Sequence, residues 1–254
     1  MKKALCFLVI SVIFFTGFKK QPPQKVTVAV AANMQYAMKA LEEKFEKETG
    51  IIVEVIFGSS GKLTQQIEEG APYDVFVSAD TKYPAELFNK KFTAGSPRVY
   101  ASGSLVLWTG RSDIKPSSDL QLLSGDNIKK IALANPKTAP YGVAAEETLK
   151  YYKLYDKIQS KLVYGESISQ TTQFIVTQSA DIGFTAKSVV LADEMQGKGA
   201  WVAIDSKAYN PISQAAVILK HGEENNKEAA EKFYKFLYSN SAKEIYKKFG
   251  YIVK

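Results

Sequence analysis

The chain has 254 residues, of which 46% are hydrophobic and 23% charged, and its formal net charge is +7. This composition is ordinary for a globular protein and excludes extensive disorder, and the length suits one large α/β domain or two smaller lobes. The basic residues are scattered and form no stripe with interleaved aromatic residues. The sequence therefore argues against nucleic-acid binding.

The N-terminal segment has the pattern of an export signal. Three residues, Met1-Lys2-Lys3, precede an apolar run over residues 4–18, and a Lys-Lys-Gln-Pro-Pro segment follows. A short positive start before such a run is typical of a secretory signal peptide, and a membrane span needs about 20 apolar residues. An uncleaved membrane anchor is the alternative. We expect residues 1–23 to be a signal peptide with a short linker, which predicts a periplasmic protein.

Sequence signatures of enzyme active sites are scarce. Cys6 is the only cysteine and lies inside the expected leader, so the mature chain has no thiol for catalysis or metal binding. His221 is the only histidine and stands beside Gly222 in a polar stretch, where we expect a surface loop. The sequence contains no G-x-S-x-G, P-loop or H-E-x-x-H motif, which argues against an enzyme.

Beyond the Pro-Pro pair, apolar strands and amphipathic helices alternate along the chain. The expected strands cover residues 26–32, 51–57, 73–78, 105–108, 130–134, 161–165, 181–185, 201–204 and 214–219. The expected helices start near residues 34, 62, 143, 168 and 188, and two more close the chain. Such alternation predicts mostly parallel sheets covered on both faces, with ligands bound beyond the carboxyl ends of the strands.

Four junctions between a strand or its loop and a helix contain small, polar or glycine residues. They are Asn33, Ser59-Ser60-Gly61, Tyr141-Gly142 and Ser167-Ile168. The first turn of a helix has unpaired N–H groups and the positive end of the helix dipole, so several such ends around one point would bind an anion without lysine or arginine. Ordinary helix capping is the alternative and suffices for any single junction.

Tyr151 and Tyr152 form the other pattern that could bind a ligand. Paired tyrosines bind ferric iron in periplasmic proteins of similar build. Here the pair falls within an expected amphipathic helix, and no histidine or carboxylate support is evident beside it. Packing is the interpretation that the helical spacing favours.

Several stretches of the chain match one protein family together. They are Val28-Ala29-Val30-Ala31-Ala32-Asn33-Met34, Phe57-Gly58-Ser59-Ser60-Gly61-Lys62-Leu63, the segment from Gly70 to Asp80, the segment from Asn135 to Gly142 and the segment from Ala242 to Tyr251. With these motifs, the chain resembles the molybdate-binding proteins that serve as periplasmic components of molybdate ABC importers. The resemblance covers residues 25–254.

The resemblance implies an α/β fold of the two-lobed periplasmic binding protein type. Each lobe would be a mostly parallel sheet flanked by helices, and two chain crossovers would join the lobes. Lobe I would comprise residues 24–101 and 211–254, and lobe II residues 102–210. The lobes would close on the ligand like a clamp.

The function that the resemblance implies is that of a solute-binding protein and not an enzyme. The protein would capture molybdate, and also tungstate, in the cleft between the lobes and deliver it to the membrane permease of an ABC transporter. It would act as a monomer and need no cofactor. A binding protein for sulfate or ferric iron on the same fold is the alternative, and an exported enzyme is a more distant one.

The resemblance also implies which residues bind the tetrahedral oxyanion. The donors would be Asn33, Ser60, Tyr141 and Ile168, with Ala32, Ser59 and Gly61 as possible additions. Asn33 would donate from its side-chain amide, its backbone N–H or both, and Ile168 from its backbone alone. All contacts would be N–H and O–H donors to oxygen, with no protein ligand bound directly to the metal atom.

One departure from the family pattern concerns a tyrosine hydroxyl. Some relatives have a tyrosine donor where this chain has Ala186, and the same relatives have a small residue where this chain has Tyr141. We infer that Tyr141 supplies the phenol from the other side of the site. The number of donors would then be kept while their geometry changes.

Overall fold

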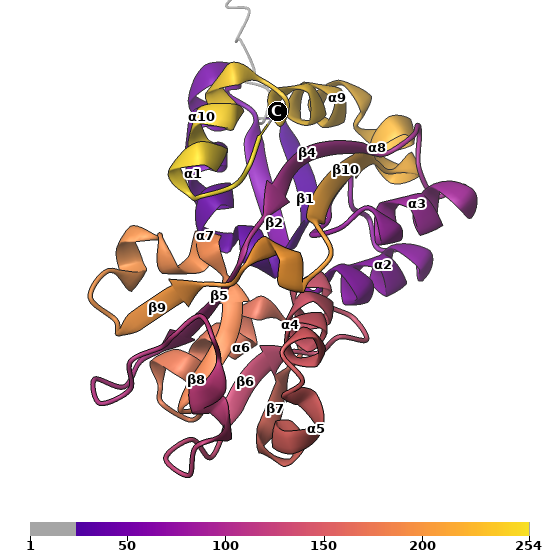
Figure 1. Cartoon of the computed structure of the whole chain (residues 1–254). Helices are drawn as coiled ribbons and strands as arrows, with labels where there is room; N and C mark the ends of the chain where they lie inside the picture. The colour runs from indigo at the N-terminus through magenta and orange to yellow at the C-terminus, as the bar shows by residue number, and fades with distance from the viewer. Residues whose placement is uncertain (1–23, 254) are drawn as a thin grey trace, which may run out of the picture.

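The computed structural model describes residues 24–253, and the expected signal peptide lies outside this range. Figure 1 shows two lobes, one above the other, each built around a sheet with helices packed on it. The strands are β1 (Lys25–Ala31), β2 (Ile52–Gly58), β3 (Val75–Val77), β4 (Arg98–Gly103), β5 (Leu105–Thr109), β6 (Ile131–Ala134), β7 (Leu162–Gly165), β8 (Ile182–Ala186), β9 (Ala200–Ala203) and β10 (Ile212–Ile218).

The helices fall between these strands and at the C-terminal end. The α-helices are α1 (Gln35–Thr49), α2 (Ser60–Glu68), α3 (Lys82–Asn89), α4 (Pro140–Tyr151), α5 (Tyr155–Ile158), α6 (Ile168–Val176), α7 (Lys187–Val190), α8 (Lys220–Asn225), α9 (Lys227–Phe236) and α10 (Asn240–Lys248). Short 3-10 turns are η1 (Ala32–Met34), η2 (Gln121–Ser124), η3 (Gln159–Lys161), η4 (Asp193–Met195) and η5 (Ser206–Ala208).

Each lobe contains one five-stranded sheet, and the two sheets have the same plan. The first sheet has the order β2-β1-β3-β10-β4, and the second has the order β7-β6-β8-β5-β9. In each sheet the first three strands of this order run parallel, and the fourth pairs antiparallel with both of its neighbours. The predicted two-lobed, mostly parallel α/β fold is confirmed.

The one reversed strand of each sheet has a common origin in the chain path. β5 is the first strand after the chain leaves β4 of the first sheet, and β10 is the first strand after the chain leaves β9 of the second. A strand that enters a sheet directly from the neighbouring lobe arrives from the cleft side, whereas the βα units start at the far side. The two crossovers therefore produce the two antiparallel strands.

Alternation along β1 distributes its side chains between two cores of the first lobe. Val26, Val28 and Val30 belong to the cluster beneath α1, α9 and α10, while Ala29 belongs to the cluster beneath α2 and α3. Successive side chains of a strand point to opposite faces, so a strand covered by helices on both faces is apolar throughout. The second lobe has its own large core around β5, β6 and β8.

Some element limits differ from those expected from the sequence. The helix expected from residue 143 begins at Pro140, since proline has no N–H and suits the first helical position. The strand expected over 73–78 is shorter and covers Val75–Val77. The helix expected over 188–195 divides into α7 and the turn η4.

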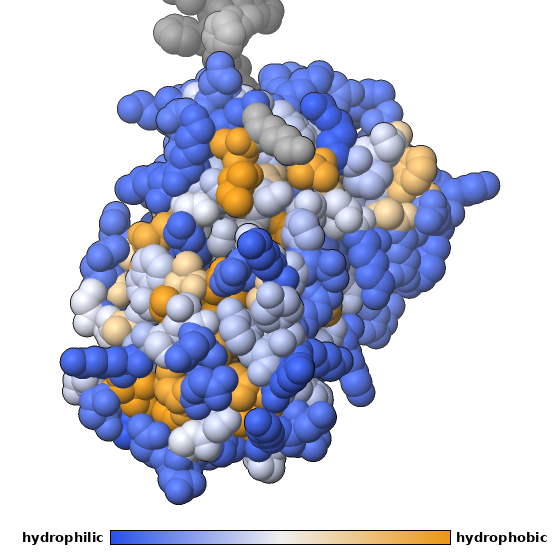
Figure 2. Space-filling model, in the orientation of Figure 1, coloured by the Kyte–Doolittle hydropathy of each residue, from blue (hydrophilic) through white to orange (hydrophobic). Residues whose placement is uncertain are grey.

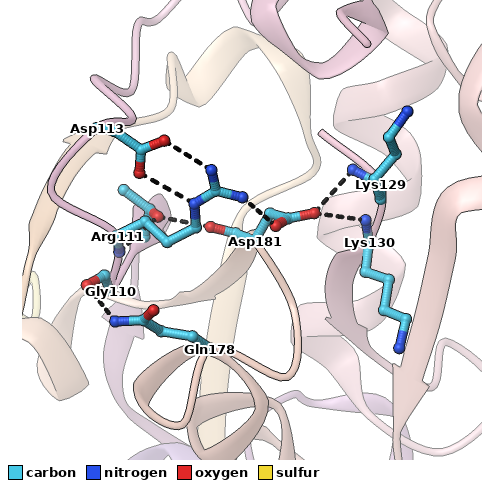
Figure 3. A network of polar contacts seen from close by, with 8 residues as sticks. Gly110, Arg111, Asp113, Lys129, Lys130, Gln178 and Asp181 are labelled. Carbon is cyan, nitrogen blue, oxygen red and sulfur yellow. Dashed lines mark hydrogen bonds and ion pairs between the residues drawn. The ribbon is translucent and has the colours of Figure 1, made fainter. Parts of the chain in front are cut away.

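The end of the second sheet far from the first lobe is closed by a polar network around Asp181 (Figure 3). Its carboxylate accepts the backbone N–H groups of Lys129 at 2.7 Å and Lys130 at 2.9 Å, and it also pairs with Arg111. Burial raises the pKa of this carboxyl, but these three donors outweigh the effect and hold the pKa below its usual value. The network therefore anchors the starts of β6 and β8 away from the cleft.

His221 does not lie in a surface loop, contrary to the sequence prediction. It belongs to α8, and its Nδ1 lies 2.9 Å from Oδ1 of the buried Asp74. The other carboxylate oxygen of Asp74 accepts from the Thr27 N–H and from Asn226. The histidine thus helps to fasten α8 to the start of β3.

Hydrophilic residues cover most of the face in Figure 2, and hydrophobic residues show mainly in the lower lobe, around the level of β6 and β8. Among the described residues, no helix has the length and apolar character needed to cross a bilayer.

Glu42 provides a test of the packing of α1. Burial raises its pKa to about 7, and the negative charges of Glu46 and Glu43 act in the same direction. Its neutral form is therefore favoured in the folded protein, so wild-type stability falls as the pH rises from about 4.5 to 7. We expect Glu42→Gln to raise the Tm by about 1–3 °C at pH 8 and to leave it unchanged at pH 4, by thermal unfolding.

Glu228→Gln is the matched control, because Glu228 is an exposed helical acid that pairs with Lys232 at 2.7 Å. It should show no gain over the same pH range. An equal Tm increase from Glu42→Gln at both pH values would contradict the assigned cause.

Candidate functional site

The expected site residues meet in one small cavity between the two lobes. Its wall is formed by Ala31, Ala32, Asn33, Ser59, Ser60, Ala79, Ala139, Pro140, Tyr141 and Ile168. The structure thus brings together the four main candidates, with Ala32 and Ser59 beside them. The wall comes from the carboxyl ends of β1 and β2, the loop after β3, and the starts of α4 and α6.

Two serines cap helices at the cavity and leave the next residue free to donate. The Ser59 hydroxyl accepts from the Lys62 N–H at 3.4 Å, and the Ser167 hydroxyl accepts from the Gln170 N–H at 3.5 Å. Ser60 and Ile168 are therefore the first helical residues of α2 and α6. The N–H of a first helical residue has no partner within its helix, so both N–H groups are available to the cavity.

The Ser60 hydroxyl has a defined polarity. Its Oγ accepts the backbone N–H of Ala79 at 3.0 Å, and the residue is 1% exposed. Because the oxygen already accepts a hydrogen bond from the protein, the hydroxyl proton remains for donation to a ligand. Ser60 can therefore offer both an N–H and an O–H to a ligand.

Tyr141 has the same arrangement in the opposite lobe. Its Oη accepts a hydrogen bond from Gln214 Nε2 at 3.1 Å, and its side chain is fully buried. Burial raises the pKa of the Tyr141 hydroxyl well above its usual value. The phenol therefore stays protonated near neutral pH and can act as a neutral donor.

The side-chain amide nitrogen of Asn33 is bonded to other residues of the protein and is not free to bind a ligand. The Asn33 amide donates to Gln214 Oε1 at 3.0 Å and to the Tyr251 hydroxyl at 3.1 Å. Its backbone carbonyl accepts from Ser188 at 2.8 Å and from Tyr251 at 3.0 Å. The amide nitrogen is thus engaged within the protein, whereas Asn33 Oδ1 is buried with no hydrogen-bond partner among the described residues. The backbone N–H in turn η1 is the donor left for the cavity.

No lining residue of this cavity carries a charged side chain. The local field comes instead from the helix N-termini of α2, α4 and α6 and from turn η1. Each helix end behaves as about half a positive charge and stabilises an anion by roughly 0.3–1 kcal/mol, more where it is buried. The arrangement suits an anion that carries several acceptor oxygens.

The two lobes touch around the cavity. The Gly61 N–H donates to the Thr138 carbonyl at 2.9 Å, and the Lys62 ammonium pairs with Glu166 at 2.6 Å. Gly61, one of the possible additional donors, thus has its N–H engaged by the other lobe. The space left between the lobes can hold about one water molecule.

A layer of polar side chains beneath the cavity was not anticipated from the sequence. Gln214 connects Asn33, Tyr141 and Tyr100, and the Tyr251 hydroxyl closes the group. A sequence signal was present, because Gln214 is a polar residue at the start of an otherwise apolar strand. Its partners could not be found from that pattern.

The tyrosine pair considered for ferric iron lies elsewhere. Tyr151 is the last residue of α4 and is 56% exposed, whereas Tyr152 follows the helix and packs against the core of the second lobe. The packing interpretation therefore holds for Tyr152 and is wrong for Tyr151. Neither residue lines the cavity between the lobes.

A fold of two similar lobes around a small uncharged cavity with several hydrogen-bond donors defines a two-lobed ligand-binding protein. The model of the bacterial extracellular solute-binding proteins matches residues 26–252. The chain belongs to this family of bacterial extracellular solute-binding proteins. As members of this family are solute-binding proteins, it is not an enzyme.

Individual relatives are similar over most of the chain. The molybdate-binding protein ModA of Azotobacter vinelandii is 41% identical over 229 residues, 89% of each chain. The protein of the same name from Rhodobacter capsulatus is 38% identical over 90% of this chain and 88% of its own. The solved structure of the A. vinelandii periplasmic molybdate-binding protein has a TM-score of 0.85 at 34% identity, covering 90% of this chain and 99% of that one.

Gly103 allows a test of the site geometry. A Cβ atom at this position would lie 1.9 Å from the Tyr141 hydroxyl oxygen and 2.5 Å from Gln214 Nε2. We expect Gly103→Ala to lower the Tm by about 3–10 °C through overpacking, with part of the loss recovered when Tyr141→Phe is added. Thermal unfolding of the two single variants and the double variant measures this.

Gly95→Ala is the control, because nothing lies within 4 Å of a Cβ atom there. The same Tm loss in both glycine variants would show that the close approach at Gly103 is not the cause.

Proposed function

We propose that this chain captures molybdate in the cavity between its lobes and delivers it to the permease of a molybdate ABC importer. The observation that carries the proposal is the uncharged cavity. Backbone N–H groups at the starts of four helices or turns, and two hydroxyl groups, can donate hydrogen bonds into it. The names of the most similar relatives support molybdate as the oxyanion. Molybdate is the transported ligand in this proposal, and no cofactor takes part.

Each proposed donor has a defined role at the oxyanion. Ser60 and Tyr141 donate from their hydroxyl and backbone groups, and Asn33 and Ile168 donate from their backbone N–H groups. The four oxygens of such a dianion only accept hydrogen bonds. A set of N–H and O–H donors therefore satisfies them without a neighbouring positive charge. Ala32 and Ser59 complete the wall. Tungstate has the same charge and shape, and we propose that it binds as well.

Tyr141 takes the place of the tyrosine that some relatives have at the position of Ala186. Ala186 is fully buried at the end of β8 and is absent from the cavity wall, whereas Tyr141 lines it. These positions support a donor supplied from the start of α4.

The proposed function also assigns roles to the two lobes and to the N-terminal segment. We assign lobe I to residues 24–101 and 211–254 and lobe II to residues 102–210, a division that follows the two sheets except that β4 extends to Gly103. We further propose that residues 1–23 direct export, so that the mature protein acts as a monomer in the periplasm. Separation and closure of the lobes would admit the oxyanion, and the closed form would meet the permease.

Sulfate is the second candidate, because it is also a tetrahedral dianion and the donor set alone does not distinguish the two. Ferric iron receives less support. Its tyrosine ligands bind as phenolates, and the raised pKa of the buried Tyr141 disfavours that form.

Titration calorimetry of residues 24–254 against molybdate, tungstate, sulfate and phosphate tests the proposal. We expect molybdate and tungstate to bind most tightly. Ser60→Ala and Tyr141→Phe should each weaken molybdate binding about 10-fold or more, because each removes a hydrogen bond to a charged ligand.

Thr148→Val is the matched control for these substitutions. Thr148 is fully buried in α4, the helix of Tyr141, and bonds only to the Ala144 carbonyl of the same helix, at 2.8 Å. The molybdate affinity of the Thr148→Val variant should equal that of the wild type. Tight sulfate binding without any molybdate heat would overturn the assignment.

A further inference from the structure

Gln214 occupies an unusual place for a polar side chain. It lies near the start of β10, the strand that returns from the second lobe, where the pairing of β10 with β4 shifts register between Gln214 and Ala215. Its side chain is fully buried. A buried carboxamide is costly unless its oxygen and its nitrogen both find partners, so its contacts indicate its purpose.

The two ends of the Gln214 carboxamide have different partners. Oε1 accepts from the Tyr100 hydroxyl at 2.7 Å and from the Asn33 amide at 3.0 Å. With the oxygen end so engaged, the nitrogen end points to the Tyr141 hydroxyl, to which Nε2 donates at 3.1 Å. The carboxamide thus orients one group from each side of the cavity, Asn33 from the first lobe and Tyr141 from the second.

The direction of the bond to Tyr141 determines what the phenol can do. A hydroxyl has one proton, and a phenol that donated to Gln214 would have none left for a ligand. Because Gln214 donates instead, the Tyr141 proton is left for the cavity. The Ala79 N–H has the same relation to the Ser60 hydroxyl at 3.0 Å.

We propose that Gln214 is a positioning residue that fixes the Tyr141 hydroxyl as a donor to the bound oxyanion. This inference rests on the proposed function and goes beyond it, since Gln214 does not line the cavity. Gly103 of β4 belongs to the same arrangement, because its missing side chain leaves room for both ends of the Gln214–Tyr141 bond. The donor polarity of the site is thus set at the crossover between the lobes.

The test compares Gln214→Met in the wild type and in the Tyr141→Phe background. The substitution keeps the length of the side chain and removes the N–H donor. We expect molybdate affinity to fall about 10-fold in the wild-type background and less than 3-fold when Tyr141 has no hydroxyl to orient. Thr148→Val in both backgrounds is the control, and it should change neither affinity.

Gln214→Glu gives an independent readout. A carboxylate only accepts hydrogen bonds, so the Tyr141 hydroxyl would donate to it and no longer to the ligand, and its negative charge would lie near the oxyanion. We expect at least a 100-fold loss of affinity at pH 8. Complete burial of position 214 favours the protonated carboxyl. Affinity should therefore recover between pH 8 and pH 6 in this variant while the wild type changes little.

The outcomes separate the two proposals. Absence of molybdate binding by the wild type would overturn the proposed function itself. Wild-type binding with an equal loss from Gln214→Met in both backgrounds would overturn only the role of Gln214, since a merely structural residue acts regardless of the Tyr141 hydroxyl. If Gln214→Met does not fold, a Gln214→Glu variant whose affinity is independent of pH would overturn that role as well.

Discussion

The structure depends on one requirement: an anion that is buried without a charged partner must be surrounded by N–H and O–H donors that have no other acceptor in the protein. Moving a charge out of water is costly, and only well-aimed hydrogen bonds offset the loss of hydration. The cavity between the lobes has no charged residue in its wall, so the direction of every hydroxyl and amide there matters. One reversed hydroxyl would replace an attraction with a repulsion.

The fold meets this requirement by repetition. Both sheets place the carboxyl ends of parallel strands and the first turns of helices at the cleft (Figure 1), so each lobe contributes helix N-termini without a specialised loop. One backbone group of the wall and one side chain behind it donate to the two hydroxyl oxygens. Ala79 orients Ser60 through its backbone, and Gln214 orients Tyr141 through its side chain. In each lobe the oxygen of a hydroxyl thus accepts from an N–H group, from the backbone at Ser60 and from a side chain at Tyr141.

The sequence predicted the strands, helices and their junctions better than the contacts between residues far apart along the chain. Strand and helix periodicity predicted the mostly parallel sheets, the family resemblance implied the two lobes, and the residues at four junctions do converge on one cavity. Capping follows local rules, so Ser59 and Ser167 could be read from their neighbours. Gln214 could not, because its partners Tyr141 and Asn33 lie 73 and 181 residues away along the chain. The same distance problem concealed the contact of His221 with Asp74.

The register between β4 and β10 bears on how the lobes move. The pairing extends to Gly103 opposite Ile212, where both strands leave the first sheet, so the crossovers begin as a hydrogen-bonded ribbon and not as two separate tethers. A ribbon bends across its flat face more readily than it shears along its length, because shear breaks the ladder of hydrogen bonds. Pairing up to the crossovers therefore favours bending of one lobe against the other over sliding.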